Sequence, residues 1–228
     1  HEARGDFVPV VADHHQPADA DTEFHVNPLL EGLNGASELS GAGAAYVLAR
    51  ALEPDGVDNR DLAALTVVGA VGDMQESEGE LVGANATIVE EGVAVGALET
   101  RKDPSVYGKQ TRPLPKLLEY ASDLDIPGIS NDPDGVRDFR VGVDVDCYGD
   151  GDWRTWVDLS MAERQTVASG LVQHAIRRGV PAARIEELVA TAYTLPDEPE
   201  GTELRDASEF STLLNATARY ERADVGLA

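Results

Sequence analysis

The fold class follows from the stretch Val10-Val11-Ala12-Asp13-His14-His15-Gln16-Pro17. The apolar residues before Asp13 predict a strand buried in a parallel sheet. Three side chains that can bind metal then stand at its carboxyl end, where open α/β sheets bind ligands. Imidazole and carboxylate groups together suit Mn, Zn or Fe. A chance Asp-His-His triplet is common, so it is the strand in front of it that leads us to predict an α/β fold with a metal site.

Three helices are predicted after this strand, over residues 41–52, 59–71 and 81–91, because apolar residues recur there at helical spacing. The second of them ends in the small residues and aspartate of Gly69-Ala70-Val71-Gly72-Asp73. Small residues allow close backbone approach, so we predict that Asp73 faces the same pocket as the strand end. The alternative is an aspartate at a solvated helix end, which an isolated Gly-Asp pair would favour.

Residues 123–138 are predicted to be a linker, because Pro, Gly and Asn recur there. Strands are predicted over 139–145 and 153–157, and a capping box at 160–163 opens a further helix. Trp153 and Trp156 are expected on opposite faces, with one of them in a core. The predicted organisation is an α/β domain over residues 1–122, the linker over 123–138, and a second α/β domain over 139–228.

The sequence carries 42 acidic residues against 18 basic ones, a formal net charge of -24. The acidic residues are spread along the whole chain, and the lysines are limited to Lys102, Lys109 and Lys116. Such a surface stays hydrated in concentrated salt, where the screening length shrinks to about 3 Å at roughly 1 M. We therefore expect a halophilic protein. Its net charge does not exclude an anionic substrate, because a local basic groove can exist within an acidic shell.

Cysteine content and hydropathy bear on the compartment. Cys147 is the single cysteine of the sequence, which excludes an intramolecular disulfide and is typical of a reducing cytoplasm. No apolar run reaches the roughly 18 residues of a membrane helix. We therefore expect a cytoplasmic protein with no membrane partner.

Four segments taken together resemble the DHH phosphoesterase superfamily in their order and spacing: Ala12–Pro17, His25–Pro28, Glu38–Gly43 and Gly69–Asp73. A later segment, Leu204–Ala216, is similar to the DHHA1 substrate domain of archaeal RecJ-like single-strand exonucleases. The resemblance implies a partial DHH domain with a parallel sheet over 1–122 and a partial, truncated DHHA1-type α/β domain over 139–228. The first two motifs of the family supply further aspartates and a histidine from upstream strands. They have no counterpart here, so we expect a fragment that is inactive alone.

The resemblance also implies roles for individual residues. His14 and Asp73 would bind metal, with Asp73 bridging two ions, and Asp13 would be a ligand or would orient its neighbour. His15 would contact the scissile phosphate, so that Asp13 and His15 are the candidate catalytic residues. The complete site would hold two Mn²⁺ or Mg²⁺ ions that activate water for attack on phosphorus. Since metal–ligand bonds are about 2 Å long, His14 and Asp73 should converge to about 4–6 Å.

The DHHA1-like segment offers candidate substrate-binding residues, which are Arg205, Asn215 and Arg219. Arginine can bind phosphate in a bidentate manner, and asparagine can hydrogen-bond phosphate or sugar. The competing interpretation of Arg205 is a surface ion pair with Asp206 or Glu209. We expect the arginines Arg205, Arg219 and Arg222 to line the cleft that faces His15.

The function implied for the full protein is metal-dependent hydrolysis of phosphodiester bonds in single-stranded DNA or RNA. Replication or repair proteins are candidate partners. Two alternatives remain open: a phosphodiesterase for short oligonucleotides or cyclic dinucleotides, and a catalytically inactive replication scaffold. Retention of Asp13, His14, His15 and Asp73 argues against the scaffold, since an inactive site has no need of these side chains.

Overall fold

The computed structural model describes residues 8–18, 23–149 and 151–226. The chain divides into two compact units. Unit 1 holds His1–Glu99 together with Leu214–Ala228, and unit 2 holds Thr100–Leu213. Both units combine helices with short strands, so the predicted α/β class is confirmed. None of the helices formed by the described residues has the length and apolar character that crossing a membrane requires.

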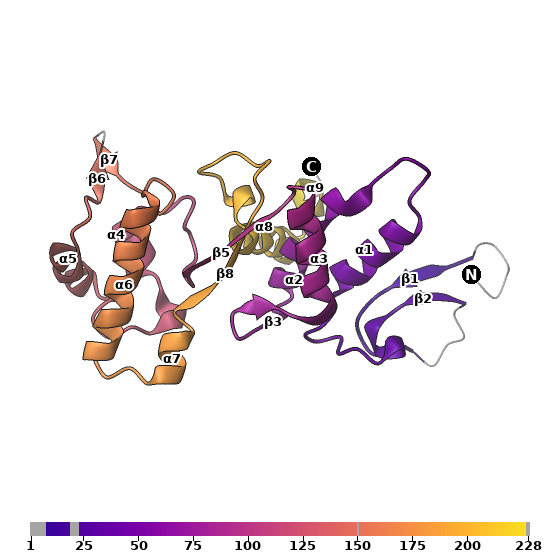
Figure 1. Ribbon diagram of the computed structural model, residues 1–228, viewed down its shortest axis with the longest axis horizontal. Coiled ribbons are helices and arrows are strands. Elements are labelled where there is room, and N and C mark those ends of the chain that lie inside the picture. The colour runs from indigo at the N-terminus through magenta and orange to yellow at the C-terminus, as the bar shows by residue number, and fades with distance from the viewer. Residues whose placement is uncertain (1–7, 19–22, 150, 227–228) are drawn as a thin grey trace. The chain divides into compact units, whose positions relative to one another are not determined.

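Unit 1 is built on a short parallel sheet. Its strands are β1 (Val10–Ala12) and β2 (Phe24–Val26), paired with Val11 opposite His25. The 3₁₀-helix η2 (Pro28–Glu31) follows β2, and α1 (Gly41–Ala51) then packs against both strands (Figure 1). Ser40 Oγ caps this helix by accepting from Gly43 N at 2.9 Å. The predicted parallel strand and the first predicted helix are therefore both present.

Helix α2 (Ala63–Gly72) packs against both α1 and α3 (Gly83–Ala94). The 3₁₀-helix η3 (Asn59–Leu62) precedes α2, and the hairpin β3 (Glu76–Ser77) and β4 (Glu80–Leu81) connects it to α3. Helix α2 is apolar except for Thr66, and most of it is buried, as is usual for a helix without a polar face. A Cβ added at Gly69 would lie 2.5 Å from Ala42 Cβ, so the small residue lets α1 and α2 approach closely.

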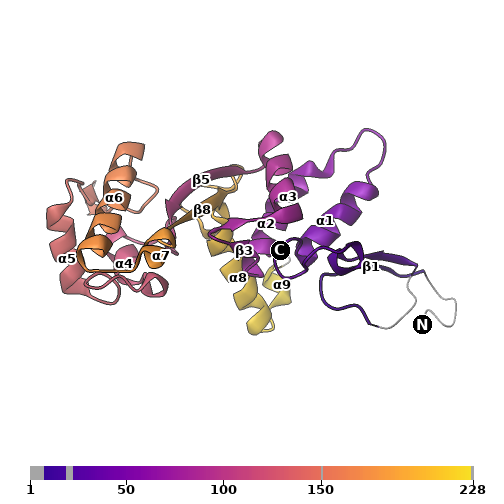
Figure 2. The ribbon, with the colours of Figure 1, turned by 60° about the horizontal axis from the view of Figure 1, so that its bottom comes forward.

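Unit 2 is mostly helical (Figure 2) and holds two pairs of strands. Strand β5 (Glu99–Pro104) pairs with β8 (Val189–Thr194), although they are far apart in the sequence. The segments between them are α4 (Leu114–Glu119), η4 (Ser122–Leu124), α5 (Pro133–Gly142), β6 (Tyr148–Gly149), β7 (Asp152–Trp153), α6 (Met161–Arg177) and α7 (Ala182–Glu186). The 3₁₀-helix η5 (Glu203–Arg205), α8 (Ala207–Arg219) and α9 (Ala223–Gly226) complete the chain, with α8 continuing from unit 2 into unit 1.

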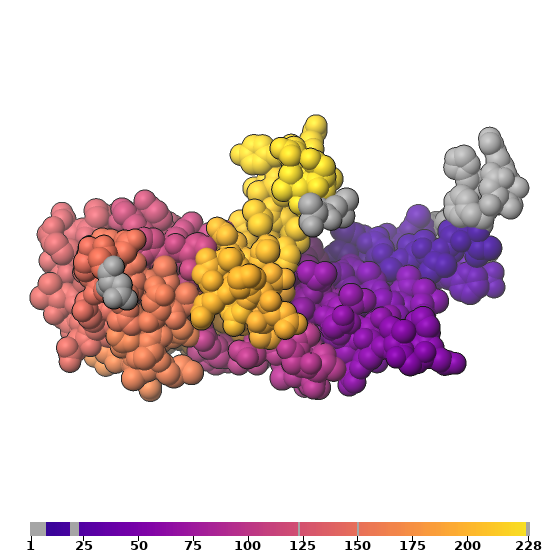
Figure 3. All heavy atoms as spheres, turned by 90° about the horizontal axis from the view of Figure 1, so that it is seen from above, coloured from indigo at the N-terminus to yellow at the C-terminus, as the bar shows by residue number. Residues whose placement is uncertain are grey.

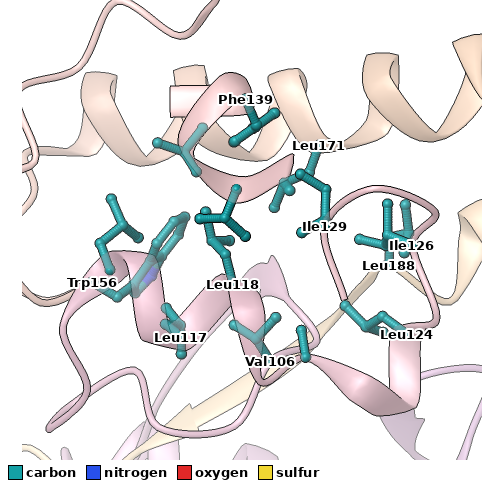
Figure 4. Close-up of a cluster of buried hydrophobic side chains, with 14 of the residues drawn as sticks. Val106, Leu117, Leu118, Leu124, Ile126, Ile129, Phe139, Trp156, Leu171 and Leu188 are labelled. Atoms are coloured by element: carbon teal, nitrogen blue, oxygen red, sulfur yellow. The ribbon is translucent and has the colours of Figure 1, made fainter. Parts of the chain in front are cut away.

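The core of unit 2 gathers apolar side chains from segments far apart in the sequence. Trp156 is almost fully buried, and its indole N–H donates to Asp103 Oδ2 at 3.3 Å. Trp153 is exposed, so the expectation that one of the two tryptophans lies in a core is confirmed. The other core residues include Val106, Leu117, Leu118, Ile126, Ile129, Phe139, Leu171 and Leu188 (Figure 4).

The structure corrects the linker predicted over residues 123–138. Ile126, Ile129 and Val136 from this range are buried in the core of unit 2. Asp132 Oδ1 accepts from Gly135 N at 2.8 Å, so Pro133 and Gly135, which were predicted to form turns in a linker, lie in the first turn of helix α5. In the space-filling view the pink segment before residue 150 and the orange segment after it lie against each other (Figure 3). The range 139–228 is also divided between the two units, at Leu214.

The strand predicted over residues 139–145 was wrong, because α5 continues to Gly142. Phe139, Val141 and Val143 alternate with other residues and so imitate a strand. In the helix only Phe139 faces the core, together with Val136 three residues earlier, whereas Val141 is 86% exposed. Of the strand predicted over 153–157, only the first residue is in a strand. The capping box and the helix after it are confirmed.

This capping box contains a carboxylate with several partners. Ser160 Oγ accepts from Glu163 N, and Ser160 N donates to Glu163 Oε2 at 2.7 Å. Arg154 binds both carboxylate oxygens of Glu163, at 2.6 and 2.9 Å. The hydrogen bonds from Arg154, and then those from Ser160, lower the pKa of Glu163 to about 2. Glu163 therefore joins the start of α6 to the segment before it.

We expect Glu163→Gln to lower the free energy of unfolding at neutral pH by about 1–2 kcal/mol, because charged hydrogen bonds are lost at a partly exposed position. The pKa is lower in the folded chain than in the unfolded one. The stabilisation is therefore present above pH 4.5 and is lost as the pH falls toward about 2. Urea unfolding at neutral and acidic pH measures this, with exposed Glu186→Gln as the control. An equal difference between Glu163→Gln and the unaltered chain at both pH values would contradict the expectation.

Candidate metal centre

Asp13, His14 and His15 follow β1 directly, at the carboxyl end of the parallel pair. Sheet pairing extends one residue past the strand, since Asp13 N donates to Val26 O at 3.1 Å. His14 N then donates to the Asp13 carboxylate at 2.8 Å. Asn27, just after β2, donates from Nδ2 to the His15 carbonyl at 3.0 Å and is itself buried. The two strand ends therefore hold the three predicted side chains together.

The imidazole of His14 and the carboxylate of Asp73 lie side by side, with Nε2 and Oδ2 3.4 Å apart. His14 Nδ1 lies 2.7 Å from the Gly35 carbonyl oxygen, which can only accept, so Nδ1 carries the proton of the neutral ring. Nε2 then presents its lone pair to the carboxylate oxygen. Two acceptors face each other, and a proton or a cation between them satisfies both. The predicted convergence is observed, at a distance somewhat shorter than the expected range of about 4–6 Å.

The geometry fits a metal ion. Two ligand atoms bound at about 2.0–2.2 Å to one ion with a tetrahedral angle are about 3.4 Å apart, which is the separation of the His14 and Asp73 atoms. Ligand atoms of Asp13, His14 and His15 also lie within 4.8 Å of one another. A histidine that binds metal commonly donates its other N–H to a backbone carbonyl, as His14 does to Gly35. This donor set of imidazole and carboxylate suits Mn²⁺ and similar divalent ions.

Asp13 and His15 form a second pair, which is more exposed. His15 Nδ1 lies 2.9 Å from Asp13 Oδ1, and its side chain is 75% exposed. The hydrogen bond from His15, and then the one from the His14 backbone, lowers the pKa of Asp13. The hydrogen bond to Asp13 in turn raises the pKa of His15. Because Asp13 occupies Nδ1, the other ring nitrogen of His15 is left for an external acceptor such as a phosphate oxygen.

Gln75 belongs to the centre and was missed by the sequence analysis. It is buried, and its Nε2 donates to Gly35 O at 2.8 Å and to Asp73 Oδ2 at 2.9 Å. His14 Nδ1 lies 3.3 Å from the same nitrogen, because both groups point at the Gly35 carbonyl. Gln75 therefore ties the histidine and the carboxylate of the central pair to one backbone oxygen. A glutamine three residues past the end of a helix gave no sequence signal of this role.

The orientation of the Gln75 amide is itself fixed. Asn85 Nδ2 donates to Gln75 Oε1 at 3.1 Å, so this oxygen must be the acceptor and Nε2 the donor. Asn85 Oδ1 accepts from Ser40 N at 3.2 Å, which determines the Asn85 amide in the same way. These hydrogen bonds form a continuous series. Ser40, the N-cap of α1, donates to Asn85 on α3, which donates to Gln75. Gln75 in turn donates to the Asp73 carboxylate. Each buried polar group in it has a partner, as a rigid site requires.

A glycine makes the approach to His14 possible. A Cβ at Gly35 would lie 2.3 Å from the His14 carbonyl oxygen, far inside contact distance. A side chain at Gly41 would lie 3.2 Å from His14 Cδ2. Substitution at residue 35 would therefore displace the histidine and the carbonyl that sets its tautomer.

The structure separates the three predicted substrate-binding residues. Asn215, in unit 1, donates from Nδ2 to the Gly72 carbonyl at 3.5 Å, next to Asp73. Arg219 lies four residues later on the same helix, is exposed, and forms no ion pair with any residue that the structure describes. Arg205, in unit 2, donates to the carbonyls of Pro196 and Glu198, so its guanidinium is occupied by backbone rather than by Asp206 or Glu209. Asn215 is thus the one of the three that contacts the end of α2.

Comparison with known protein families gives a separate observation on unit 2. Residues 106–189 match the DHH-CID domain family. The match covers less than half of the chain, so it shows that this segment is similar to a domain of DHH-family proteins. Enzymes of the family generally depend on divalent metal ions, in agreement with the donor set of His14 and its neighbours. The match gives residues 139–189 a name different from the DHHA1-type domain that the sequence resemblance implied.

A relative of similar sequence is an uncharacterized protein of Methanocaldococcus jannaschii. The two are 24% identical over 227 residues, which is 97% of this chain and 46% of the relative. The chain therefore spans less than half the length of that relative.

Proposed function

We propose that the full-length protein containing this chain is a metal-dependent phosphoesterase that cleaves phosphodiester bonds in single-stranded DNA or RNA. The observation that carries the proposal is the pair formed by His14 Nε2 and Asp73 Oδ2, which face each other at 3.4 Å. Gly35 and Gln75 hold both partners of this pair. The DHH-CID match supports the class of reaction.

His14, Asp73 and Asp13 are the residues that would hold the metal, Mn²⁺ or Mg²⁺, with further ligands from outside the described residues. When bound, such ions activate water and neutralise charge on the phosphate. Gln75 keeps one Asp73 oxygen oriented, and Gly35 keeps His14 Nε2 unprotonated in the neutral ring. The protein thereby presents two lone pairs in fixed positions, which lowers the cost of ordering them around an ion.

His15 would act on the substrate. Its Nδ1 is held by Asp13, so the ring cannot rotate freely, and its exposed Nε2 can donate to a phosphate oxygen. A charge-assisted hydrogen bond of this kind stabilises negative charge as it develops on the phosphate. Asn215 and Arg219 on α8 would contact the nucleic-acid backbone, since residues four apart share one helix face and Asn215 reaches the Gly72 carbonyl. Arg205 is a weaker candidate, because two carbonyls already bind it.

The test is digestion of labelled nucleic acids by the full-length protein with Mn²⁺. We expect nucleotides to be released from single strands, with loss of activity in EDTA and little cleavage of duplexes or cyclic dinucleotides. The 228-residue chain alone should digest single strands poorly, because His14, Asp73 and Asp13 account for only part of the ligand set that two ions need. Cleavage confined to cyclic dinucleotides would support the small-molecule alternative. A full-length protein that cleaves none of these with Mn²⁺ would support the scaffold alternative.

A further inference from the structure

A local reversal of charge occurs in unit 2. Residues 101–120 contain five basic side chains and two acidic ones, and they include all three lysines of the chain. The remaining residues are strongly acidic, since the whole chain has a formal net charge of -24. A surface of one sign repels like-charged ligands over the range of screening. Residues 101–120 are therefore one of the parts of unit 2 able to accept an anionic ligand.

Aromatic rings lie among these cations. The Arg112 guanidinium carbon lies 4.8 Å from the centre of the Tyr107 ring and 5.5 Å from that of Tyr120. Lys116 Nζ lies 5.2 Å from the centre of the Tyr120 ring. Tyr107 and Tyr120 are 37% and 50% exposed. We call Tyr107, Arg112, Lys116 and Tyr120 the Tyr107–Tyr120 patch.

Arg112 forms no salt bridge with any residue that the structure describes. Its guanidinium donates to the Tyr107 carbonyl at 3.4 Å, and no carboxylate of the described residues pairs with it. Lys116, by contrast, binds Glu119 at 2.7 Å. Gly108 has a φ of +98°, and a Cβ there would lie 2.4 Å from Arg112 Cδ. The glycine therefore leaves the space in which the arginine stem lies across the tyrosine.

The loop that carries Arg112 is anchored by buried charges. Glu209 is fully buried and accepts from Gln110 N at 3.0 Å and from Thr111 Oγ1 at 3.3 Å. Lys109 Nζ lies 3.4 Å from Asp206 Oδ2, and both side chains are buried. These contacts fix the residues directly before Arg112. A ligand at the patch would therefore meet an ordered surface, which lowers the entropic cost of binding.

We propose that the Tyr107–Tyr120 patch binds single-stranded nucleic acid, with unpaired bases on the exposed tyrosine rings and a backbone phosphate on Arg112. Single-strand binding surfaces combine cations with aromatic rings, because every base has a face that can stack. Arginine binds phosphate through its planar fork and keeps its charge. An acidic peptide would be attracted by the same charges but would gain little from the two ring faces. The proposal rests on the proposed function, since it gives the proposed substrate a binding site in unit 2.

The experiment measures binding of a fluorescein-labelled oligothymidylate of about 12 nucleotides to the 228-residue chain, in EDTA and in the salt that keeps the chain folded. Arg112→Gln and Tyr120→Leu should each weaken binding about fivefold or more, whereas Tyr120→Phe should bind normally. Arg137→Gln is the matched control, because Arg137 is an exposed arginine paired with Asp134.

Absence of binding by the unaltered chain overturns the proposal. So does equal binding by Arg112→Gln, Tyr120→Leu and the control. Equal affinity for a polyglutamate peptide would assign the patch to acidic peptides and would also overturn it. Circular dichroism shows that each variant is folded. The phosphoesterase function is tested separately, by Mn²⁺-dependent cleavage, so either idea can fail while the other stands.

Discussion

Replacing Asp73 with asparagine is expected to lower the affinity of the chain for Mn²⁺ by about 100-fold or more. Loss of an outer partner of a metal ligand costs about 10–100-fold, and loss of a ligand itself should cost at least as much. The variant keeps the shape of the side chain but removes the charge that faces His14 Nε2. Isothermal titration with Mn²⁺ measures the affinity. Asp61→Asn is the matched control, because Asp61 is exposed and lies at the start of the same helical segment.

Thermal unfolding gives an independent measurement of the same change. A ligand that binds only the folded chain raises the unfolding temperature, so Mn²⁺ should stabilise the unaltered chain and the Asp61→Asn control. It should not stabilise Asp73→Asn. In EDTA this variant should not exceed the unaltered chain in stability, because the same Asp73 oxygen faces the His14 lone pair and accepts from Gln75, and an amide nitrogen in its place would face the Gln75 N–H. An equal Mn²⁺-dependent shift in Asp73→Asn and the control would show that Asp73 is not a ligand.

Much of the candidate site could be predicted from the sequence, because its main parts depend on local patterns. An apolar run followed by Asp13-His14-His15 places these side chains at a strand end in any open α/β fold. The small residues before Asp73 mark a closely packed helix, and α2 does pack tightly against α1. The strand end and the closely packed helix can each be predicted from the spacing of the apolar residues and the order of the segments. The prediction that Asp73 converges with the strand end combined these two features.

The parts that the sequence did not reveal depend on contacts between distant segments. Gln75 donates to the carbonyl of Gly35, which is 40 positions earlier in the chain. Asn85, which donates to Gln75, accepts from the backbone N–H of Ser40, 45 positions before Asn85. Nothing in the residues around Gln75 indicates such partners. The strand predicted over 139–145 was wrong for a similar reason. Its alternating pattern was compatible with a strand, but the helix start at Asp132 and the core contact of Phe139 decide for a helix.

The second large effect is expected at Gln75, which positions the centre through other residues. Gln75→Met keeps the approximate length of the side chain but removes the N–H groups that bind Gly35 and Asp73. We expect the affinity for Mn²⁺ to fall by about 10–100-fold, as is typical when a partner of metal ligands is removed. The free energy of unfolding should also fall by about 1–3 kcal/mol, since the buried Asn85 amide loses the nearer of its two acceptors. Exposed Gln165→Met is the matched control.

A purely structural role for Gln75 predicts a different result. In that case the loss of stability would appear without a loss of Mn²⁺ affinity in the folded chain at low temperature. Nitrogen chemical shifts of the His14 ring distinguish the two roles, because they report which nitrogen carries the proton. If Gln75 positions the site, Gln75→Met should leave the Asp73 carboxylate free to rotate and should change the His14 shifts, whereas Gln165→Met should not. Asn85→Ala should reproduce part of this effect, and the double variant should be less than additive, because Asn85 acts on the metal ligands through the Gln75 amide.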